Sequence, residues 1–133
     1  YGIVTNSTIA NNGGGLFLDS GLSMYGCTVE NNAGLALGTL DSITIRGYYS
    51  RGELQRKTII RNNGKGVHTG YYGCEISDTE ITGNADFGVE FGYSDYSEDS
   101  DPSCLDMLDV IISNNHVHNN SINTADFQVH QSS

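Results

Sequence analysis

The sequence predicts an all-β fold, a right-handed single-stranded parallel β-helix (solenoid) of about five to six coils with two loop insertions. Three observations lead to this prediction. A short phrase of residues recurs along the 133-residue chain, and a second phrase follows each copy. Gly occurs 17 times, whereas Pro occurs once and Trp is absent. A narrow core repeated along one axis needs many tight turns and few large side chains.

The first phrase is a short strand that runs into a bend rich in Asn. Its apolar anchor recurs after 20, 31, 21 and 31 residues. The five anchors are Ile9, Val29, Ile60, Ile81 and Ile112. Asn accepts left-handed backbone geometry, which suits a bend, and stacked Asn amides can bond along a column. We therefore expect the anchors to form one buried column, with the Asn bends stacked beside it.

The second phrase is a strand that begins near a Gly. Its copies start at Gly15-Leu16, Gly34-Leu35, Gly66-Val67 and Gly88-Val89, with a weaker copy at Ser121-Ile122. Side chains alternate between the two faces of a strand. This alternation predicts an inward column of Leu16, Leu35, Val67 and Val89. It predicts an outward column of Phe17, Ala36, His68 and Glu90.

Two of the repeats carry about ten extra residues, which are expected to leave the solenoid as loops at roughly 47–56 and 94–104. In repeat proteins such insertions often gather on the binding face. All six Lys and Arg residues lie between positions 46 and 65, with Glu53 as the only carboxylate among them. The basic segment is therefore either part of a binding surface or a solvated loop.

The bends and short strands resemble the parallel β-helix repeats of the pectin-lyase-like superfamily. The resemblance rests on pairs such as Asn11-Asn12, Asn31-Asn32 and Asn62-Asn63, and it covers about residues 4–123. That superfamily includes polysaccharide lyases, glycoside hydrolases, uronan epimerases, tailspikes and surface proteins. Its catalytic signatures are not matched: Asn123-Thr124-Ala125-Asp126 breaks the Asn-Thr-Asp pattern, and Asp101-Pro102-Ser103-Cys104 lacks the His of Asp-Pro-His-Asp.

One outward column groups residues that suit sugar recognition. His68 and Glu90 occupy matching positions in adjacent coils and are the candidate acid–base pair. Tyr71 and Tyr93 align in the same way, and tyrosine rings can stack on sugar rings. With two cations that could neutralise a uronate or sulfate, the predicted ligand site comprises Arg46, Lys65, His68, Tyr71 and Tyr93. The alternative is an exposed ladder that only stabilises the solenoid.

Segment 95–101 concentrates four carboxylates in seven residues, and they are Asp95, Glu98, Asp99 and Asp101. Ca²⁺ takes about six to eight oxygen ligands, so this loop could supply several of them. A solvated acidic loop is the alternative, because the EF-hand order is missing. His116 and His118 share one strand face, but the sequence fixes no third zinc ligand. No cofactor is therefore certain, and calcium is the candidate.

The cysteines fall into two types. Cys74 lies seven residues before anchor Ile81, and Cys104 lies eight residues before anchor Ile112. These matching offsets place Cys74 and Cys104 within disulfide reach in neighbouring coils. Cys27 falls in an inward column, where a small buried thiol is ordinary.

The expected function is that of an extracellular or surface-exposed module, secreted or on a cell or virion surface, that binds a glycan or serves as a structural spacer. The alternative is a polysaccharide lyase, hydrolase or uronan epimerase acting on acidic glycans. The net charge of −10 disfavours duplex nucleic acid and anionic lipid as partners, and no apolar run is long enough to span a membrane. The chain reads as one domain over 1–133, taken from a longer polypeptide because it enters the repeat directly at Tyr1. Open solenoid ends could support association between copies.

Overall fold

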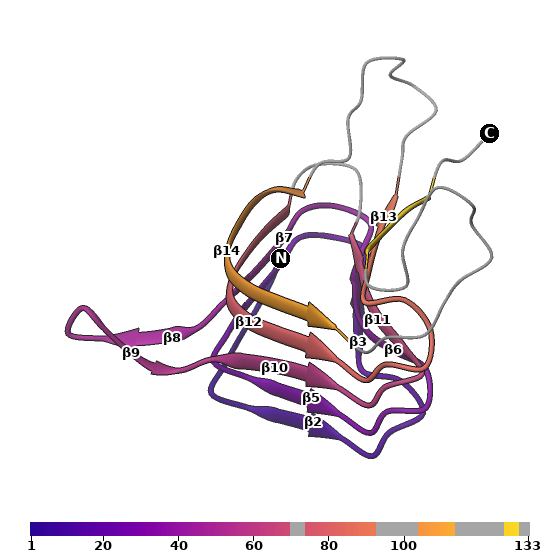
Figure 1. The fold of residues 1–133 in the computed structure, drawn as a ribbon, viewed down its shortest axis with the longest axis horizontal. Coiled ribbons are helices and arrows are strands. Elements are labelled where there is room, and N and C mark those ends of the chain that lie inside the picture. The colour runs from indigo at the N-terminus through magenta and orange to yellow at the C-terminus, as the bar shows by residue number, and fades with distance from the viewer. Residues whose placement is uncertain (70–73, 93–103, 114–126, 131–133) are drawn as a thin grey trace.

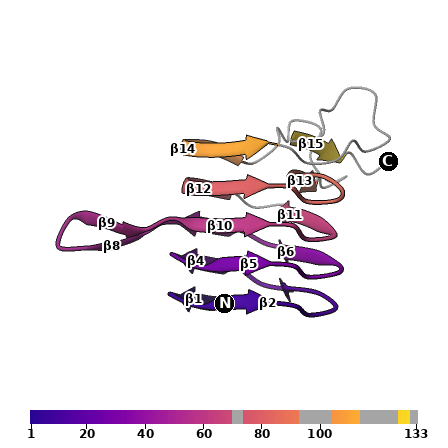
Figure 2. The same cartoon turned by 60° about the horizontal axis from the view of Figure 1, so that its bottom comes forward.

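The computed structural model describes residues 1–69, 74–92, 104–113 and 127–130. Parallel strands stack as a β-solenoid of about four turns, and the described residues contain no helix (Figure 1, Figure 2). The predicted fold class is confirmed. The expected count of five to six coils is slightly too high. The five anchor residues pair in succession, and four turns of the chain separate the first anchor from the last. In this part of the chain no helix has the length and hydropathy of a membrane span.

Two large parallel sheets wrap around one apolar interior. The eight-stranded sheet contains, in order, β1 (Gly2–Thr5), β4 (Leu22–Tyr25), β7 (Ile43–Arg46), β12 (Cys74–Thr82), β10 (Thr58–Arg61), β5 (Thr28–Glu30) and β2 (Thr8–Ala10), with β14 (Cys104–Ser113) paired to β12. The five-stranded sheet contains β15 (Phe127–His130), β13 (Val89–Gly92), β11 (Lys65–Thr69), β6 (Leu35–Thr39) and β3 (Leu16–Leu18). Successive turns of the chain therefore lie one above another, as Figure 2 shows.

The predicted anchor column is confirmed. Ile9 pairs with Val29, Val29 with Ile60, and Ile60 with Ile81. The side chains of Val29, Ile60 and Ile81 are fully buried, whereas Ile9, in the end coil, is only partly buried. Ile81 continues the column by pairing with Ile112. Like-on-like stacking of aliphatic residues thus forms the centre of the core.

The second inward column differs from the prediction in one coil. Leu16 pairs with Leu37, and Leu37 pairs with Val67. Leu35, which was expected in this column, instead pairs with Lys65 and is partly exposed. Strict alternation would put both leucines on the inner face, but Ala36 joins Leu37 in the core, and the Leu35 side chain lies beside the outward position of Gly38. The sequence pattern alone could not distinguish the two registers.

The outward column changes accordingly. Ala36 was expected to point outward, but it is fully buried. The backbone of Gly15 packs directly against Ala36. The approach is so close that a Cβ at Gly15 would overlap the carbonyl oxygen of Ala36. Gly38 takes the outward position, between Phe17 and His68. The side chains of Leu35 and Phe17 fill the space beside Gly38, because a Cβ at Gly38 would lie 2.7 Å from Leu35 and 2.8 Å from the ring of Phe17.

The Asn bends form a hydrogen-bonded ladder inside the solenoid. The first residue of each bend adopts left-handed geometry, at Asn11, Asn31, Asn62 and Gly83. The second residue is buried in three successive coils, where Nδ2 of Asn32 donates to Oδ1 of Asn63 at 2.9 Å. Nδ2 of Asn63 donates in turn to Oδ1 of Asn84 at 3.0 Å. The expected stacking of Asn amides is therefore present.

The first predicted insertion is a β-hairpin rather than a loop. β8 (Tyr48–Ser50) and β9 (Glu53–Arg56) pair antiparallel and extend away from the solenoid (Figure 1). Arg51 and Gly52 connect them with φ of 53° and 76°, as in the two-residue turns that match the twist of a hairpin. The second predicted insertion covers residues 94–104. Of these, residues 94–103 lie outside the described residues.

The structure places Cys74 and Cys104 as register partners on β12 and β14. Adjacent strands lie about 4.8 Å apart, which is within the Cα separation of about 4.4–6.8 Å that a disulfide requires. Cys27 is buried and free. The disulfide stays a prediction: thiol titration of denatured, unreduced protein is expected to find one free thiol per chain. Three free thiols would contradict the pairing.

Candidate functional site

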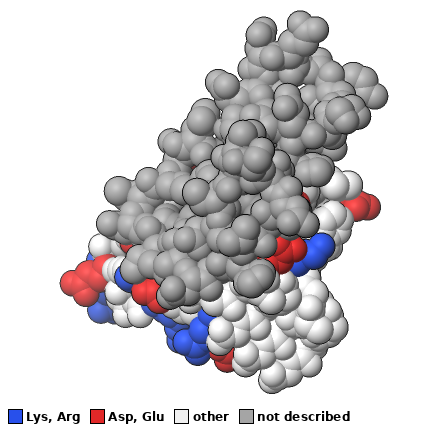
Figure 3. Space-filling model, turned by 45° about the vertical axis from the view of Figure 1, so that its right-hand side comes forward, with Lys and Arg blue, Asp and Glu red and all other residues white. Residues whose placement is uncertain are grey.

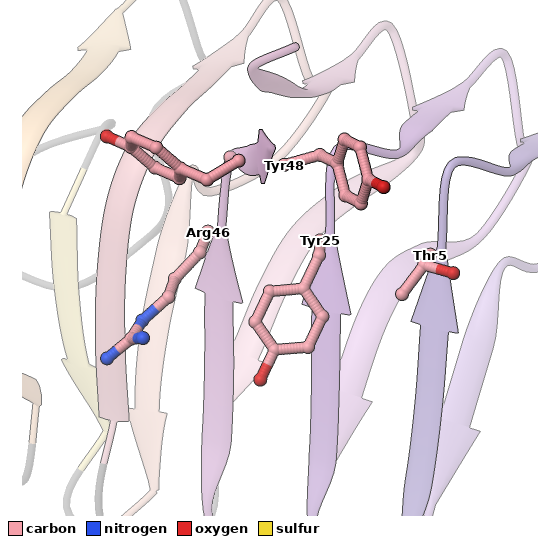
Figure 4. A pocket seen from close by; sticks show the side chains of 6 residues that line it. Thr5, Tyr25, Arg46 and Tyr48 are labelled. Carbon is pink, nitrogen blue, oxygen red and sulfur yellow. The ribbon is translucent and has the colours of Figure 1, made fainter. Parts of the chain in front are cut away.

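The hairpin leaves the solenoid beside a row of outward side chains on the eight-stranded sheet. Thr5, Tyr25 and Arg46 are the last residues of β1, β4 and β7, and they are register neighbours (Figure 4). The preceding residue of each strand packs in or against the core. Because side chains alternate along a strand, the last residue of each strand points outward.

The first residues of β8 turn this row into a pocket. Tyr48 lies at the carboxyl ends of the three strands, next to Tyr25 (Figure 4). The pocket has a volume of about 300 Å³ and is lined by Thr5, Tyr25, Arg46, Gly47, Tyr48 and Tyr49. We call it the tyrosine pocket. It combines aromatic side chains with one guanidinium group at the root of the inserted hairpin.

The hairpin root is held against the solenoid by specific contacts. The hydroxyl of Tyr49 donates a hydrogen bond to Oδ2 of Asp78 at 2.6 Å. Gly26 has a φ of 61°, and a Cβ at this position would lie 2.5 Å from Cβ of Tyr48. Oγ1 of Thr58 donates to the last carbonyl oxygen of β7 at 2.7 Å. The walls of the tyrosine pocket are therefore positioned before any ligand binds, which lowers the entropic cost of binding.

Arg46 makes an ion pair with Glu75, which lies in the next coil. The two side chains are 44% and 38% exposed. Ion pairs at this degree of exposure contribute only about 0–1 kcal/mol to stability, because water screens the charges. A ligand could therefore replace the contact between Arg46 and Glu75 by its own hydrogen bonds to either side chain, with little loss in the free energy of unfolding.

These groups are suited to holding a sugar. The apolar face of a tyrosine ring can stack on the face of a pyranose, and its hydroxyl can bond at the edge. A guanidinium group only donates hydrogen bonds, and a carboxylate only accepts them. Arg46, which lines the pocket, and its ion-pair partner Glu75, which does not line it, thus offer a donor and an acceptor side by side.

The structure separates the residues of the predicted ligand site. Arg46 lies in the tyrosine pocket on the eight-stranded sheet. Lys65 and His68 lie on β11 of the five-stranded sheet. Tyr71 and Tyr93 lie outside the described residues. Of the predicted residues, Arg46 is the one that the structure places in the pocket.

The predicted contact between His68 and Glu90 is confirmed. The two residues are register partners on β11 and β13. Nδ1 of His68 lies 3.0 Å from Oε1 of Glu90, and the side chains are 23% and 16% exposed. The sequence predicted this contact because the two coils carry the same spacing. A catalytic role for the pair stays a prediction.

The candidate metal ligands fall outside the described residues. This holds for the four carboxylates of the acidic segment, which are Asp95, Glu98, Asp99 and Asp101, and for His116 and His118. Within the described part of the chain, no group of three His, Cys, Asp or Glu side chains could hold a metal ion. The calcium site stays a prediction.

Sequence reasoning missed Tyr25, although a signal was present. Tyr25 directly precedes the bend at Gly26, just as Thr5 precedes the bend at Asn6, and both bend residues have positive φ. Aligning the two bends places Thr5 beside Tyr25. Extending that alignment by one coil reaches Arg46, the residue before the hairpin.

A second hollow lies at the bend before β3 and β6. It has a volume of about 380 Å³ and is lined by Gly13, Gly14, Gly15, Leu16, Phe17, Gly34 and Leu35. Its lining offers one aromatic ring and no charged or hydroxyl-bearing side chain. The tyrosine pocket carries more of the groups that recognise a polar ligand.

Comparison of the chain with known protein families, with curated proteins and with solved structures finds no match. What the structure supports of the resemblance to the pectin-lyase-like repeats is the parallel β-solenoid fold. A fold of this kind hosts many activities, so function has to be inferred from the site itself.

Proposed function

We propose that this chain is an extracellular or surface-exposed β-solenoid module that binds a glycan in the tyrosine pocket. The observation that carries the proposal is the gathering of Tyr25, Tyr48 and Tyr49 with Arg46 around one hollow. Its volume of about 300 Å³ is at the lower end of ligand sites, which range from about 300 to 1,000 Å³. A site of this size suits one or two sugar units of a longer chain.

The position of the pocket supports a binding role. Insertions in repeat proteins often form the binding face, and this pocket is built where the inserted hairpin leaves the solenoid. Short oligosaccharides are expected to bind with dissociation constants roughly between micromolar and millimolar, because a few hydrogen bonds and stacked rings provide the free energy.

Replacing Tyr25 or Tyr48 by Leu is expected to weaken glycan binding about two- to tenfold, because ring stacking contributes about 0.5–1.5 kcal/mol beyond the area that it buries. Leu retains bulk and removes the flat aromatic face. A glycan array followed by calorimetry on the best ligand measures the effect, and circular dichroism checks the fold.

Phe17→Leu is the matched control, because Phe17 is 49% exposed and lies on the five-stranded sheet. It should leave glycan binding unchanged. The proposal fails if the wild-type protein binds no glycan, or if both tyrosine variants bind as well as the wild type.

A second candidate function is a polysaccharide lyase, hydrolase or uronan epimerase that acts on acidic glycans. The contact of 3.0 Å between His68 and Glu90 favours it, because a carboxylate can orient an imidazole that acts as a general base. Incubation with acidic glycans distinguishes the two candidates. Release of unsaturated products, abolished by His68→Gln, would favour the enzyme over the binding module.

A further inference from the structure

The cation of the tyrosine pocket already has a counter-charge. Nη2 of Arg46 contacts Oε1 of Glu75, so the guanidinium group does not face the pocket as a lone positive charge. A uronate or sulfate entering the pocket would approach both charges of this pair. Its attraction to Arg46 is partly offset by repulsion from Glu75, which contacts Arg46 although it does not line the pocket.

Other charges around the hairpin root are also balanced. Arg56 faces the first residue of β8 across the hairpin and adds a second cation. Asp78, which is 9% exposed and accepts the hydrogen bond from Tyr49, adds a second carboxylate. With Arg46 and Glu75, these residues give two positive and two negative charges. The surroundings of the pocket therefore do not select an anion.

Two further ion pairs on the described surface follow the same pattern. Arg61 pairs with Glu30 at 2.7 Å, and Lys57 lies 3.9 Å from Glu80, in each case between neighbouring coils. On the face that Figure 3 shows, Lys and Arg side chains lie beside Asp and Glu side chains. The whole chain carries −10, and a net charge of this sign repels a polyanion at long range.

The paired side chains are instead suited to hydroxyl groups. Arg46 can donate from the nitrogen atoms that Glu75 leaves unused, and Glu75 can accept through its second oxygen. A hydroxyl can accept the first bond and donate the second. Two adjacent hydroxyls of a sugar stacked beside Tyr25 can therefore engage a donor and an acceptor together.

We infer that the tyrosine pocket takes a neutral sugar with adjacent hydroxyls, and that Glu75 is the residue that excludes acidic sugars. The inference rests on the proposed function, because it names the ligand class of the same pocket. It differs from the sequence-based expectation, which assigned Arg46 to neutralising a uronate or sulfate. The difference arises because the sequence does not show that Glu75 pairs with Arg46.

The test is a glycan panel in which neutral gluco-, galacto- and manno-oligosaccharides stand beside uronate and sulfated counterparts of matched length. Wild type, Glu75→Gln and Glu30→Gln are compared at about 0.15 M salt, where the Debye length is about 8 Å. Glu30→Gln is the matched control, because it removes a carboxylate from another Arg–Glu pair between coils and changes the net charge equally.

The wild type is expected to prefer the neutral members. Glu75→Gln should raise the affinity for uronates relative to neutral sugars about tenfold, because Arg46 gains a charge-assisted hydrogen bond to the ligand. Glu30→Gln should leave this ratio unchanged. Stronger binding of the wild type to acidic glycans would overturn the inference and leave the proposed function standing.

Two other outcomes are decisive. An equal shift in Glu75→Gln and Glu30→Gln would show that net charge, rather than Glu75, sets the preference, and it would overturn the role given to Glu75. Binding to no member of the panel would overturn the proposed function itself.

Discussion

Replacing Asn63 by Ala is expected to lower the free energy of unfolding by about 3–6 kcal/mol, because buried groups lose their hydrogen-bond partner. Nδ2 of Asn63 donates to the carbonyl oxygen of Val29 at 3.0 Å and to Oδ1 of Asn84 at 3.0 Å. Oδ1 of Asn63 accepts from the backbone N–H and from Nδ2 of Asn32. All of these groups lie inside the solenoid, where water does not replace the missing amide without rearrangement.

The matched control is Asn12→Ala. Asn12 belongs to the same column but is exposed, and the bond that it makes to Asn32 comes from its backbone N–H, which Ala retains. Its replacement should cost less than about 1 kcal/mol. Urea unfolding followed by far-UV circular dichroism compares the two variants. Equal losses in Asn12→Ala and Asn63→Ala would show that the ladder does not stabilise the solenoid.

Replacing Ile60 or Ile81 by Ala is expected to cost about 2–5 kcal/mol, as for other buried aliphatic residues that leave a cavity. Both side chains are fully buried, and each is stacked between neighbours of its own column. Ile3→Ala is the control, because Ile3 is 64% exposed. The assignment of the anchor column would be wrong if Ile3→Ala lowered the unfolding free energy as much as Ile60→Ala.

Much of the fold could be predicted because each coil repeats the same physical requirements. A bend needs left-handed geometry at its first residue, which Asn and Gly supply, and in three successive coils it has a buried amide at its second residue, which Asn supplies. The anchors Val29, Ile60 and Ile81 follow from their fixed distance to these bends. The contact between His68 and Glu90 followed for the same reason.

Prediction failed where the repeat offers two equivalent choices. In the second coil both Leu35 and Leu37 fit the inward face, and alternation cannot decide between them. The close approach of Gly15 to Ala36 settles the register, and that contact is a property of the packed coils. The inward and outward columns of this coil therefore had to come from the structure.

The tyrosine pocket could not be predicted as a whole because its walls come from three coils and the hairpin. The repeat places Thr5, Tyr25 and Arg46 in one row, but it does not encode how the hairpin folds back. The bond from Tyr49 to Asp78, which connects residues far apart in sequence, is one of the contacts that hold β8 against the solenoid. A surface made in this way leaves little periodic signal.

The most direct measurement is an NMR titration of the labelled protein with the neutral oligosaccharide that binds best on the panel. Saturable shifts are expected in the ring signals of Tyr25, Tyr48 and Tyr49, while the rings of Phe17 and His68 remain unchanged. Saturable shifts that cluster at His68 and leave the three tyrosines unaffected would contradict binding in the tyrosine pocket.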